Sequence, residues 1–570
     1  MRNSCITISL IFVIVLFIFS PTLSVTTISL DDTELILDLN KSIDSISLKN
    51  ILFPAPPVNY YRPLLILSYI IDCKIWQMEY SGYHLTNIIL HLLNAIIFYL
   101  IALKLFKHQE ERVNIAFFVT LLFALNPLTC ESVAWISGRS DILGAFFSLI
   151  AFLCYQSKLE FRYIPVMLFV FLGLLSKENA LASIPIIIIA DFAYNYPHKQ
   201  LIKSVQSSVK WTIILAIPFC LYLYIRLIGF DSSNASVELP AALINATNNP
   251  VSNIGFILKV PAIIAFYIKK LFIPYPLNLI INTINFKVYS LIFIIIMAIC
   301  YNLIVKRKYR QAVLLSLIII SFSPAILVAW TNIAWSLYAE RYLYLAIPVW
   351  AILMGDIYYL TSEKFDRNRI VIRALMLLII LIFSASSFHR NVIWQDKVTL
   401  WGDTYLKNID NGKVLYKYGS VLEDDKGIPF FKKAVKIAKD EDWKDFSLLV
   451  LARHEINKGN YKVAVEHINE ALRINSNSKN CIEAISALKI ISENYTGNTD
   501  KIINLLIESY KKLYLKRPNP NSLYSLGLIY LKKEKKDTAI YYFTTIINNF
   551  SKSSVAKHAR LRLAEIKPKP

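Results

Sequence analysis

Hydrophobic residues along this chain occur in long runs, and these runs predict helices that span a membrane. A spanning helix needs roughly 20 predominantly apolar residues. The first run, residues 3–30, has no charged residue and an apolar core too long for a secretory signal peptide, so we interpret it as a span that stays in place. The sequence predicts about 11 spans, near residues 3–30, 85–103, 113–130, 142–157, 163–176, 179–196, 211–230, 288–305, 311–330, 342–360 and 370–389.

The pattern changes after residue 390, where charged residues and helical periodicity replace the apolar runs. Residues 391–570 hold 31 of the 61 Lys and Arg and 20 of the 40 Asp and Glu. We therefore predict an all-α protein with a membrane domain over 1–390 and an extracytoplasmic helical domain over 391–570. An apolar content of 55% and a mean hydropathy of +0.47 exclude a disordered chain and argue against an ordinary soluble protein.

The net charge of +21 gives the orientation of the spans and does not indicate nucleic acid. Alternate connections are basic, as in 104–112, 158–162, 199–210, 306–310 and 364–373, and the positive-inside rule places them in the cytoplasm. The opposite connections are acidic. This pattern requires that the apolar segment 254–275, with its three lysines and with Pro261, Pro274 and Pro276 in or directly after it, lie in the membrane plane on the outer surface. The odd number of spans then exports the C-terminal domain.

The C-terminal domain has the character of an α-solenoid of tetratricopeptide-like repeats. Small and aromatic residues occupy the template positions in two stretches, at Leu451, Ala452, Ala464, Ile468 and Ala471, and at Leu526, Gly527, Tyr530, Ala539 and Phe543. An unrelated helical bundle is the alternative. Such arrays bind peptides or proteins, and the 31 basic residues would favour an acidic partner unless they form only a solvated face.

Ionisable residues gather in the connections of the predicted outer side, where their cost next to lipid marks a functional site. Asp31 and Asp32 follow the first span; they could hold a divalent cation, accept a proton from a hydroxyl, or only cap a helix. The Arg341 guanidinium matches the oxygens of a phosphate, or it only extends to the membrane interface within a belt of aromatic residues. The other candidates for this pocket, which would be reached from the lipid, are Arg62, His84, Glu131, Arg139, Asp141, Lys177, Glu178 and Glu340.

These residues, in this order, resemble the transmembrane and tetratricopeptide-repeat-containing O-mannosyltransferases and their prokaryotic relatives, within the membrane glycosyltransferases of the C fold. The resemblance is carried by Asp31-Asp32, Tyr61 to Leu64, His84 to Asn87 with His91, Pro127 to Asp141, Ser176 to Glu178 and Glu340 to Tyr344, and it extends to Arg390 and Trp394. It therefore covers nearly the whole chain.

The resemblance implies transfer of a mannose-like sugar from a polyprenyl-phosphate donor to a protein Ser or Thr hydroxyl, or to another extracytoplasmic acceptor. Asp31 or Asp32 would be the catalytic base. Arg341, with Lys177, would hold the donor phosphate, and the repeats would present the acceptor polypeptide or glycan. Asn126 departs from the pattern, because relatives have His before this proline.

Two other functions stay open at this stage: a membrane-anchored scaffold for envelope assembly, and a glycan ligase or polymerase. The short repeats and the Lys, Asn and Ile bias favour a bacterial inner membrane protein. The sugar, the acceptor and any metal are not indicated by the sequence.

Overall fold

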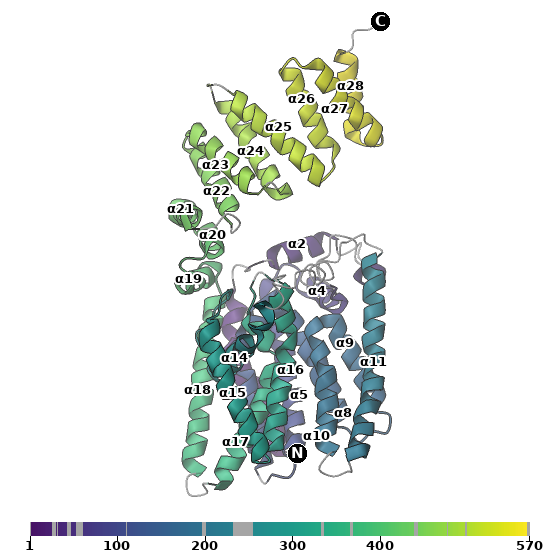
Figure 1. Ribbon diagram of the computed structural model, residues 1–570, viewed down its shortest axis with the longest axis vertical. Helices are drawn as coiled ribbons and strands as arrows, with labels where there is room; N and C mark the ends of the chain where they lie inside the picture. Colours follow the sequence, from purple (N-terminus) through teal and green to yellow (C-terminus); the bar gives the residue numbers. More distant parts are fainter. Residues whose placement is uncertain are drawn as a thin grey trace. The chain divides into compact units, whose positions relative to one another are not determined.

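The computed structural model is helical, and no residue in its described ranges lies in a strand, which confirms the predicted all-α fold. The structure describes residues 2–566 except 26–29, 31, 43–46, 53–60, 110, 196–200, 232–254, 332–333, 335, 365–368, 438–442, 476, 496 and 498. The chain divides into two compact units, Met1–Leu400 and Trp401–Pro570 (Figure 1).

Seven helices among the described residues are long and apolar enough to cross a membrane. Their exposed side chains are largely apolar; α15, for example, has no buried residue and exposes Leu291 and Ile294 by more than 60%. Lipid is the environment in which such a surface is stable. The seven comprise α1 (Arg2–Phe19), α5 (Tyr80–Leu105), α8 (Arg139–Tyr155), α11 (Leu201–Asp231), α15 (Phe286–Val305), α16 (Tyr309–Thr331) and α18 (Arg369–Trp394).

The other predicted spans correspond to helices outside these seven. Three are short, α6 (Arg112–Ala124), α9 (Tyr163–Ser176) and α10 (Ser183–Asn195), and the fourth is the 19-residue α17 (Ala346–Lys364). The predicted span 113–130 is not continuous: α6 ends at Ala124, and the chain bends by 46° into the turn η3 (Pro127–Thr129) and α7 (Cys130–Ala134). If this pair is one span the count is eight, so the figure of about 11 remains a prediction.

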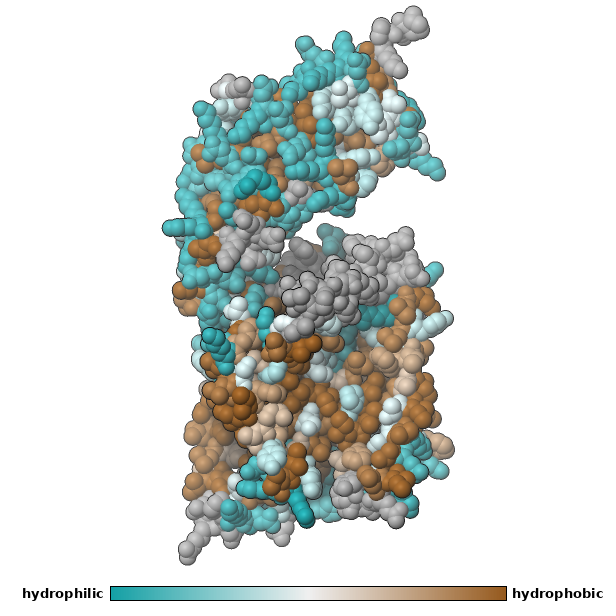
Figure 2. Space-filling view, in the orientation of Figure 1, coloured by the Kyte–Doolittle hydropathy of each residue, from teal (hydrophilic) through white to brown (hydrophobic). Residues whose placement is uncertain are grey.

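Ion pairs of the first unit gather at two ends of its helices, with the hydrophobic core between them. At one end Arg310 contacts Asp356 at 2.7 Å and Arg373 contacts Glu111 at 2.6 Å, so the ends of α6, α16, α17 and α18 meet there. Figure 2 shows hydrophobic residues over the middle of this unit and hydrophilic residues along its lower edge. The candidate site lies at the other helix ends.

The second unit consists of successive helix pairs whose small residues allow close approach. At Gly527 an added Cβ would lie 2.6 Å from the Phe543 ring, so the aromatic side chain fills the space that glycine leaves. The pairs are α20 (Gly412–Val421) with α21 (Ile428–Ile437), α22 (Lys444–Asn457) with α23 (Tyr461–Ile474), α24 (Ser478–Asn494) with α25 (Asp500–Lys516), and α26 (Pro520–Lys532) with α27 (Lys536–Asn549). Their assignment as tetratricopeptide repeats remains a prediction.

Candidate functional site

The site is built where helix ends and short 3-10 turns meet, because such ends leave backbone groups free for side chains. Asp32, the first residue of α2 (Asp32–Ser42), is 1% exposed. Its Oδ1 accepts hydrogen bonds from the Ser137 backbone N–H, at 3.1 Å, and from the Ser137 hydroxyl. Ser137 lies in the turn η4 (Ile136–Gly138), just before α8. Asp31, the other candidate base, lies outside the described residues.

Lys177 and Glu178 occupy the sharp connection between α9 and the turn η5 (Glu178–Ala182). The Lys177 Nζ atom is 2.6 Å from Asp141 Oδ2, in the first turn of α8, and both side chains are buried. Glu178 accepts from Arg62, at 2.9 Å from Nη2 and 3.1 Å from Nε. Arg62 directly precedes α4 (Pro63–Trp76). Four of the predicted acidic and basic positions therefore form two ion pairs that link α4, α8 and the connection before η5.

The turn η6 (Glu340–Leu343) contributes a second pair of buried charges. Arg341 Nη1 lies 2.5 Å from Glu131 Oε1, and the Arg341 backbone N–H donates to Glu131 Oε2 at 3.0 Å. Its neighbour Glu340 accepts from Lys270 Nζ at 2.7 Å. The Tyr342 ring lies within 5.0 Å of the Arg341 guanidinium carbon and 6.0 Å of Lys177 Nζ. One aromatic ring thus has a cation against it from each of two different turns.

Lys270 is a residue of this region that the sequence analysis did not propose. It lies in α14 (Val260–Phe272), within the segment 254–275 that is predicted to lie in the membrane plane on the outer surface, and it is 3% exposed and pairs with Glu340. The amphipathic face of α14 contacts α15 and buries Ala262, Ile263 and Phe266 as well. The lysine in an otherwise apolar face is the signal that could have indicated this pair.

Arg139 is fully buried and its contacts are internal. Its guanidinium is 2.5 Å from Asp72 Oδ2, donates to Asn87 Oδ1 at 2.7 Å and to the Tyr83 carbonyl at 3.0 Å, and lies over the Tyr69 ring. Asp72, which sequence reasoning missed, is therefore its counter-ion. These contacts join α4, α5 and α8 beneath the site.

A stripe of polar residues on α5 supports the broken backbone around the site. His84, Asn87, His91 and Asn94 recur at three- and four-residue spacing and lie on one face of the helix. Asn87 donates to the carbonyls of Val133 and Trp135, and Asn94 donates to that of Ile142. His84 is buried beside the Ala134 carbonyl without a hydrogen bond of good geometry.

The bend after α6 is capped from two sides. The Ala124 carbonyl accepts from His91 Nε2 at 3.0 Å, so the neutral ring accepts at Nδ1 from the Tyr344 hydroxyl at 2.6 Å. Asn126 Oδ1 accepts from the Leu128 N–H at 3.1 Å and caps η3. Asn126, where the resembled family has histidine, therefore has a structural contact of its own in this chain.

Lys177 is the residue whose charge depends most directly on its surroundings. Burial lowers the pKa of Lys177 to about 8; the neighbouring Asp141 opposes this shift, and the positive charges of Arg62 and Arg341 add to it. By contrast, the pKa of Glu178 is lowered: burial acts to raise it, but the charges of Arg62 and Arg226 and the hydrogen bonds to the carboxylate together outweigh that effect. The shift of Lys177 thus reflects burial above all, whereas that of Glu178 reflects the positive groups around it.

Metal ligation receives no support from the described side chains: among them, no group of three or more His, Cys, Asp or Glu could hold an ion. The residues present therefore do not form a metal site of their own, and Asp31 is not among those described.

An apolar cavity of about 580 Å³ lies among α5, α8, α10, α16 and α17. Its lining includes Ser183, the residue after η5, and Leu345, two residues after η6. It also includes Tyr309 and Arg310 at the other helix ends. The cavity therefore extends from Ser183 and Leu345, close after the turns η5 and η6, to Tyr309 and Arg310 at the other helix ends.

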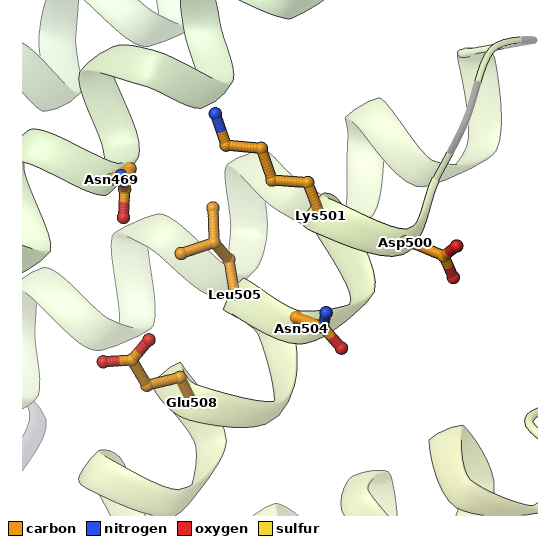
Figure 3. A pocket seen from close by; sticks show the side chains of 6 residues that line it. All are labelled: Asn469, Asp500, Lys501, Asn504, Leu505 and Glu508. Carbon is orange, nitrogen blue, oxygen red and sulfur yellow. The ribbon is translucent and has the colours of Figure 1, made fainter.

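A second cavity, of about 550 Å³, lies in the helical second unit and is lined by polar side chains. Figure 3 shows Lys501, Leu505 and Glu508 extending from α25 toward Asn469 of α23, whereas Asp500 points away. Because its lining carries charges of both signs, this cavity does not favour a ligand of either charge.

Several curated proteins are similar in sequence to this chain. The chain is 29% identical over 369 residues to protein O-mannosyl-transferase F38B6.6 of Caenorhabditis elegans, covering 64% of this chain and 51% of the relative. It is 24% identical over 423 residues to protein O-mannosyl-transferase TMTC3 of Homo sapiens, covering 67% of this chain and 45% of the relative. A 101-residue stretch is 38% identical to protein O-mannosyl-transferase TMTC1 of Mus musculus, and covers 18% of this chain and 10% of that relative.

The chain spans about half the length of the first two of these relatives. No family model matches it, and no solved structure matches it either. The curated homologues of this helical chain are protein O-mannosyl-transferases of the TMTC family, and this confirms the resemblance seen in its sequence.

Proposed function

We propose that the chain is a membrane glycosyltransferase that moves a mannose-like sugar from a polyprenyl-phosphate donor to a Ser or Thr hydroxyl of a protein. The observation that carries the proposal is the pair of buried cations, Lys177 and Arg341, that flank the Tyr342 ring at the same helix ends as Asp32. The names of the homologues agree with a sugar transfer to protein.

Asp32 is the proposed base, with Asp31 as its alternative. The acceptor hydroxyl oxygen attacks the anomeric carbon while its proton passes to the carboxylate. The bond between the anomeric carbon and the phosphate oxygen breaks, the configuration inverts, and polyprenyl phosphate leaves. Hydrogen bonds from Ser137 orient the Asp32 carboxylate. Arg62 connects the two halves of this scheme, because its charge acts both on Tyr69, beside Asp32, and on Lys177.

Arg341 and Lys177 are proposed to bind the donor phosphate and to stabilise the charge that develops on it as the bond breaks. In the structure each cation is paired with a carboxylate, Glu131 and Asp141. Phosphate oxygens would replace those contacts in part, and the fork of the arginine suits them.

The apolar cavity of about 580 Å³ is the proposed seat of the isoprenoid tail. It begins beside the turns that carry both cations, so a phosphate held there would direct its hydrocarbon chain along α8, α10 and α16. Apolar lining suits a hydrocarbon, because contact with it costs no unpaired polar group. We place the end of the first unit that carries the candidate site outside the cytoplasm. In a bacterium this is the periplasmic side of the inner membrane.

Sugar transfer in membranes tests the proposal. With a radiolabelled polyprenyl-phosphate mannose and an acceptor protein, Asp32→Asn should reduce transfer by at least about 100-fold, because general base catalysis contributes factors of that order. Asp31→Asn, assayed in parallel, decides between the two carboxylates.

Asp38→Asn provides the matched control, since it removes an exposed carboxylate from the same helix α2 and should leave transfer within about twofold. Undiminished transfer by both Asp31→Asn and Asp32→Asn, at equal expression, would contradict the mechanism. Sugar found on a glycan instead of protein would point to a ligase.

A further inference from the structure

Trp135 contacts the candidate site but has no role in the proposed reaction. It directly follows α7 and is 8% exposed. The centre of its ring lies 5.1 Å from the guanidinium carbon of Arg341, about as close as that of the Tyr342 ring, at 5.0 Å. Arg341 therefore has two aromatic rings against it, in addition to the carboxylate of Glu131.

The single turn of α7 explains why the indole and the carboxylate reach the same arginine. Glu131 and Trp135 are four residues apart, and the Trp135 backbone N–H donates to the Glu131 carbonyl at 3.3 Å. Residues at this spacing lie on one face of a helix. The Glu131 carboxylate accepts from the side chain and from the backbone N–H of Arg341, while the indole contacts the guanidinium.

The backbone at Trp135 is held by α5. Asn87 Nδ2 donates to the Trp135 carbonyl at 3.0 Å and to the Val133 carbonyl at 3.2 Å. The Oδ1 atom of Asn87 accepts from Arg139 Nε at 2.7 Å, so the orientation of this amide is defined on both sides. A substitution that changes only the ring of Trp135 leaves these backbone contacts in place.

The same short segment also holds the proposed base. Ser137 follows Trp135 by two residues, and its backbone N–H and hydroxyl both donate to Asp32 Oδ1. The Cα atoms of two residues at this separation are at most about 7 Å apart. The segment 135–137 therefore contacts the proposed base at one end and the proposed phosphate cation, Arg341, at the other.

Arginine offers two kinds of contact that do not compete with each other. Its N–H groups lie in the plane of the guanidinium and suit carboxylate or phosphate oxygens, whereas the faces of that plane pack on aromatic rings. Both ring centres lie within the distance of about 6 Å at which a cation–π contact is favourable. Phosphate oxygens that replace Glu131 in part would therefore leave the ring contacts of Arg341 intact.

We propose that Trp135 is a positioning residue of the donor site: together with the Tyr342 ring, its indole holds the Arg341 guanidinium where it meets the donor phosphate, whether Glu131 or phosphate is bound. This assignment rests on the proposed function, in which Arg341 binds that phosphate. The indole also excludes water, since Trp135 is 8% and Arg341 6% exposed. A cation–π contact is stronger where water is excluded.

Binding of a lipid phosphate, without sugar transfer, tests the assignment. The probe is tritiated farnesyl phosphate, and scintillation proximity measures its binding to the purified full-length protein in detergent. Trp135→Leu should weaken binding about 10- to 30-fold, the loss expected for a cation–π contact shielded from water. Trp135→Phe keeps an aromatic ring on the same backbone and should stay within about threefold of the wild type.

The double variant Trp135→Leu/Arg341→Gln shows whether the indole acts through the arginine. Arg341→Gln alone should weaken binding at least about 30-fold, because a charged hydrogen-bond donor is lost. Trp135→Leu should then weaken it by no more than a further factor of about two. Full additivity would overturn the proposal, because the indole would then act through general packing. Unchanged binding by Trp135→Leu alone would overturn it as well.

Trp350→Leu is the matched control. Trp350 of α17 is 3% exposed and lies 6.0 Å from the Phe272 ring and 6.2 Å from the Phe383 ring, so its replacement also removes a buried indole from the first unit. Its affinity should stay within about twofold of the wild type, and its effect should add to that of Arg341→Gln. Weakening equal to that of Trp135→Leu would contradict a specific role of Trp135.

Transfer assays separate this role from that of the base. Trp135→Leu should raise the donor KM by the factor seen in binding and change kcat by less than about threefold, whereas Ser137→Ala, which removes a hydrogen bond to Asp32, should lower kcat instead. A protein that binds farnesyl phosphate in this way but transfers no mannose would contradict the proposed reaction and support the assignment of Trp135. Equal binding by the wild type and Arg341→Gln would contradict both.

Discussion

At the scale of single residues, Lys177 differs from the other cations of the site because its charge can be lost near neutral pH. Its pKa of about 8 lies well below that of a solvated lysine, chiefly through burial. Arginine keeps its charge at any pH that a protein tolerates. Two cations that hold the same phosphate would therefore respond differently to pH.

Donor affinity is expected to follow the charge of Lys177. Below pH 8 the ammonium is present, and above it the proton is lost, so the donor KM should rise about tenfold between pH 7 and pH 9 while kcat changes less. The donor phosphodiester keeps one negative charge over this range. Initial rates at several donor concentrations and pH values measure the effect.

Lys177→Arg supplies the control for this experiment, since its guanidinium stays charged and its donor KM should be flat from pH 7 to pH 9. A wild-type KM that does not change across this range would be inconsistent with a role of Lys177 in phosphate binding.

Single residues also show what sequence can and cannot predict about the site. Glu131, Asp141, Lys177 and Arg341 were predicted to converge because ionisable residues in short connections between spans are costly unless they meet. Their actual partners were not predictable. Asp72, the counter-ion of Arg139, lies far from it in sequence, and only the packing of α4 against α8 brings the two together.

At the scale of elements, α5 combines a hydrophobic helix with a row of hydrogen-bonding side chains. Asn94 and His91 both reach the Tyr344 hydroxyl, and Asn94 also satisfies the Ile142 carbonyl at the start of α8. This row holds the turn that carries Arg341 against α8, which carries Asp141. The spacing of the row is visible in the sequence, but the broken backbone that it satisfies is not.

Asn94→Leu and Tyr344→Phe should each lower stability by about 1–3 kcal/mol, because each leaves buried polar groups unpaired. The double variant should cost less than the sum, since both substitutions remove the same hydrogen bond. Thermal unfolding of the purified protein in detergent, followed by tryptophan fluorescence, measures the cycle. Ile89→Leu, at a lipid-exposed position of α5, controls for the substitution itself; strict additivity would argue against the shared contact.

The predicted helix boundaries agree best with the structure where the ends of an apolar run coincide with the ends of a helix. The predicted span 163–176 coincides with α9, and 288–305 differs from α15 by two residues. The run 113–130 was less informative, because Leu125, Asn126 and Pro127 interrupt the helix without interrupting the hydrophobicity by much. Hydropathy measures what surrounds a helix, whereas a bend depends on where its backbone hydrogen bonds go.

At the scale of the whole molecule, charges are sorted between two ends of the first unit. Arg310, Asp356, Glu111 and Arg373 meet at one end, and the candidate site forms at the other. The basic connections between spans lie at the end with Arg310 and Arg373, and their excess of positive charge predicts that this end faces the cytoplasm. The second unit follows α18 in the sequence. The C-terminus of α18 lies at the same end of the first unit as the candidate site.

Labelling of single cysteines in intact cells tests this orientation. In a background with the native cysteines replaced by serine, Lys552→Cys should react with a membrane-impermeant maleimide, because the proposed topology places the second unit outside the cytoplasm. Lys158→Cys, in the connection between α8 and α9, should react only after permeabilisation. Both positions are exposed, so accessibility itself does not differ. The opposite pattern would invert the proposed topology.

Glu340 and Arg341 are neighbours in sequence but form ion pairs with different helices. Glu340 pairs with Lys270 of α14, and Arg341 pairs with Glu131 of α7. Displacing their turn would strand two buried charges of opposite sign at once, each at a cost of several kcal/mol. The turn is therefore a rigid part of the candidate site, against which the proposed donor would be held. The connection before η5 is held in the same way, by Lys177 to Asp141 of α8 and by Glu178 to Arg62 before α4, so a bulky donor would meet a rigid wall at both turns.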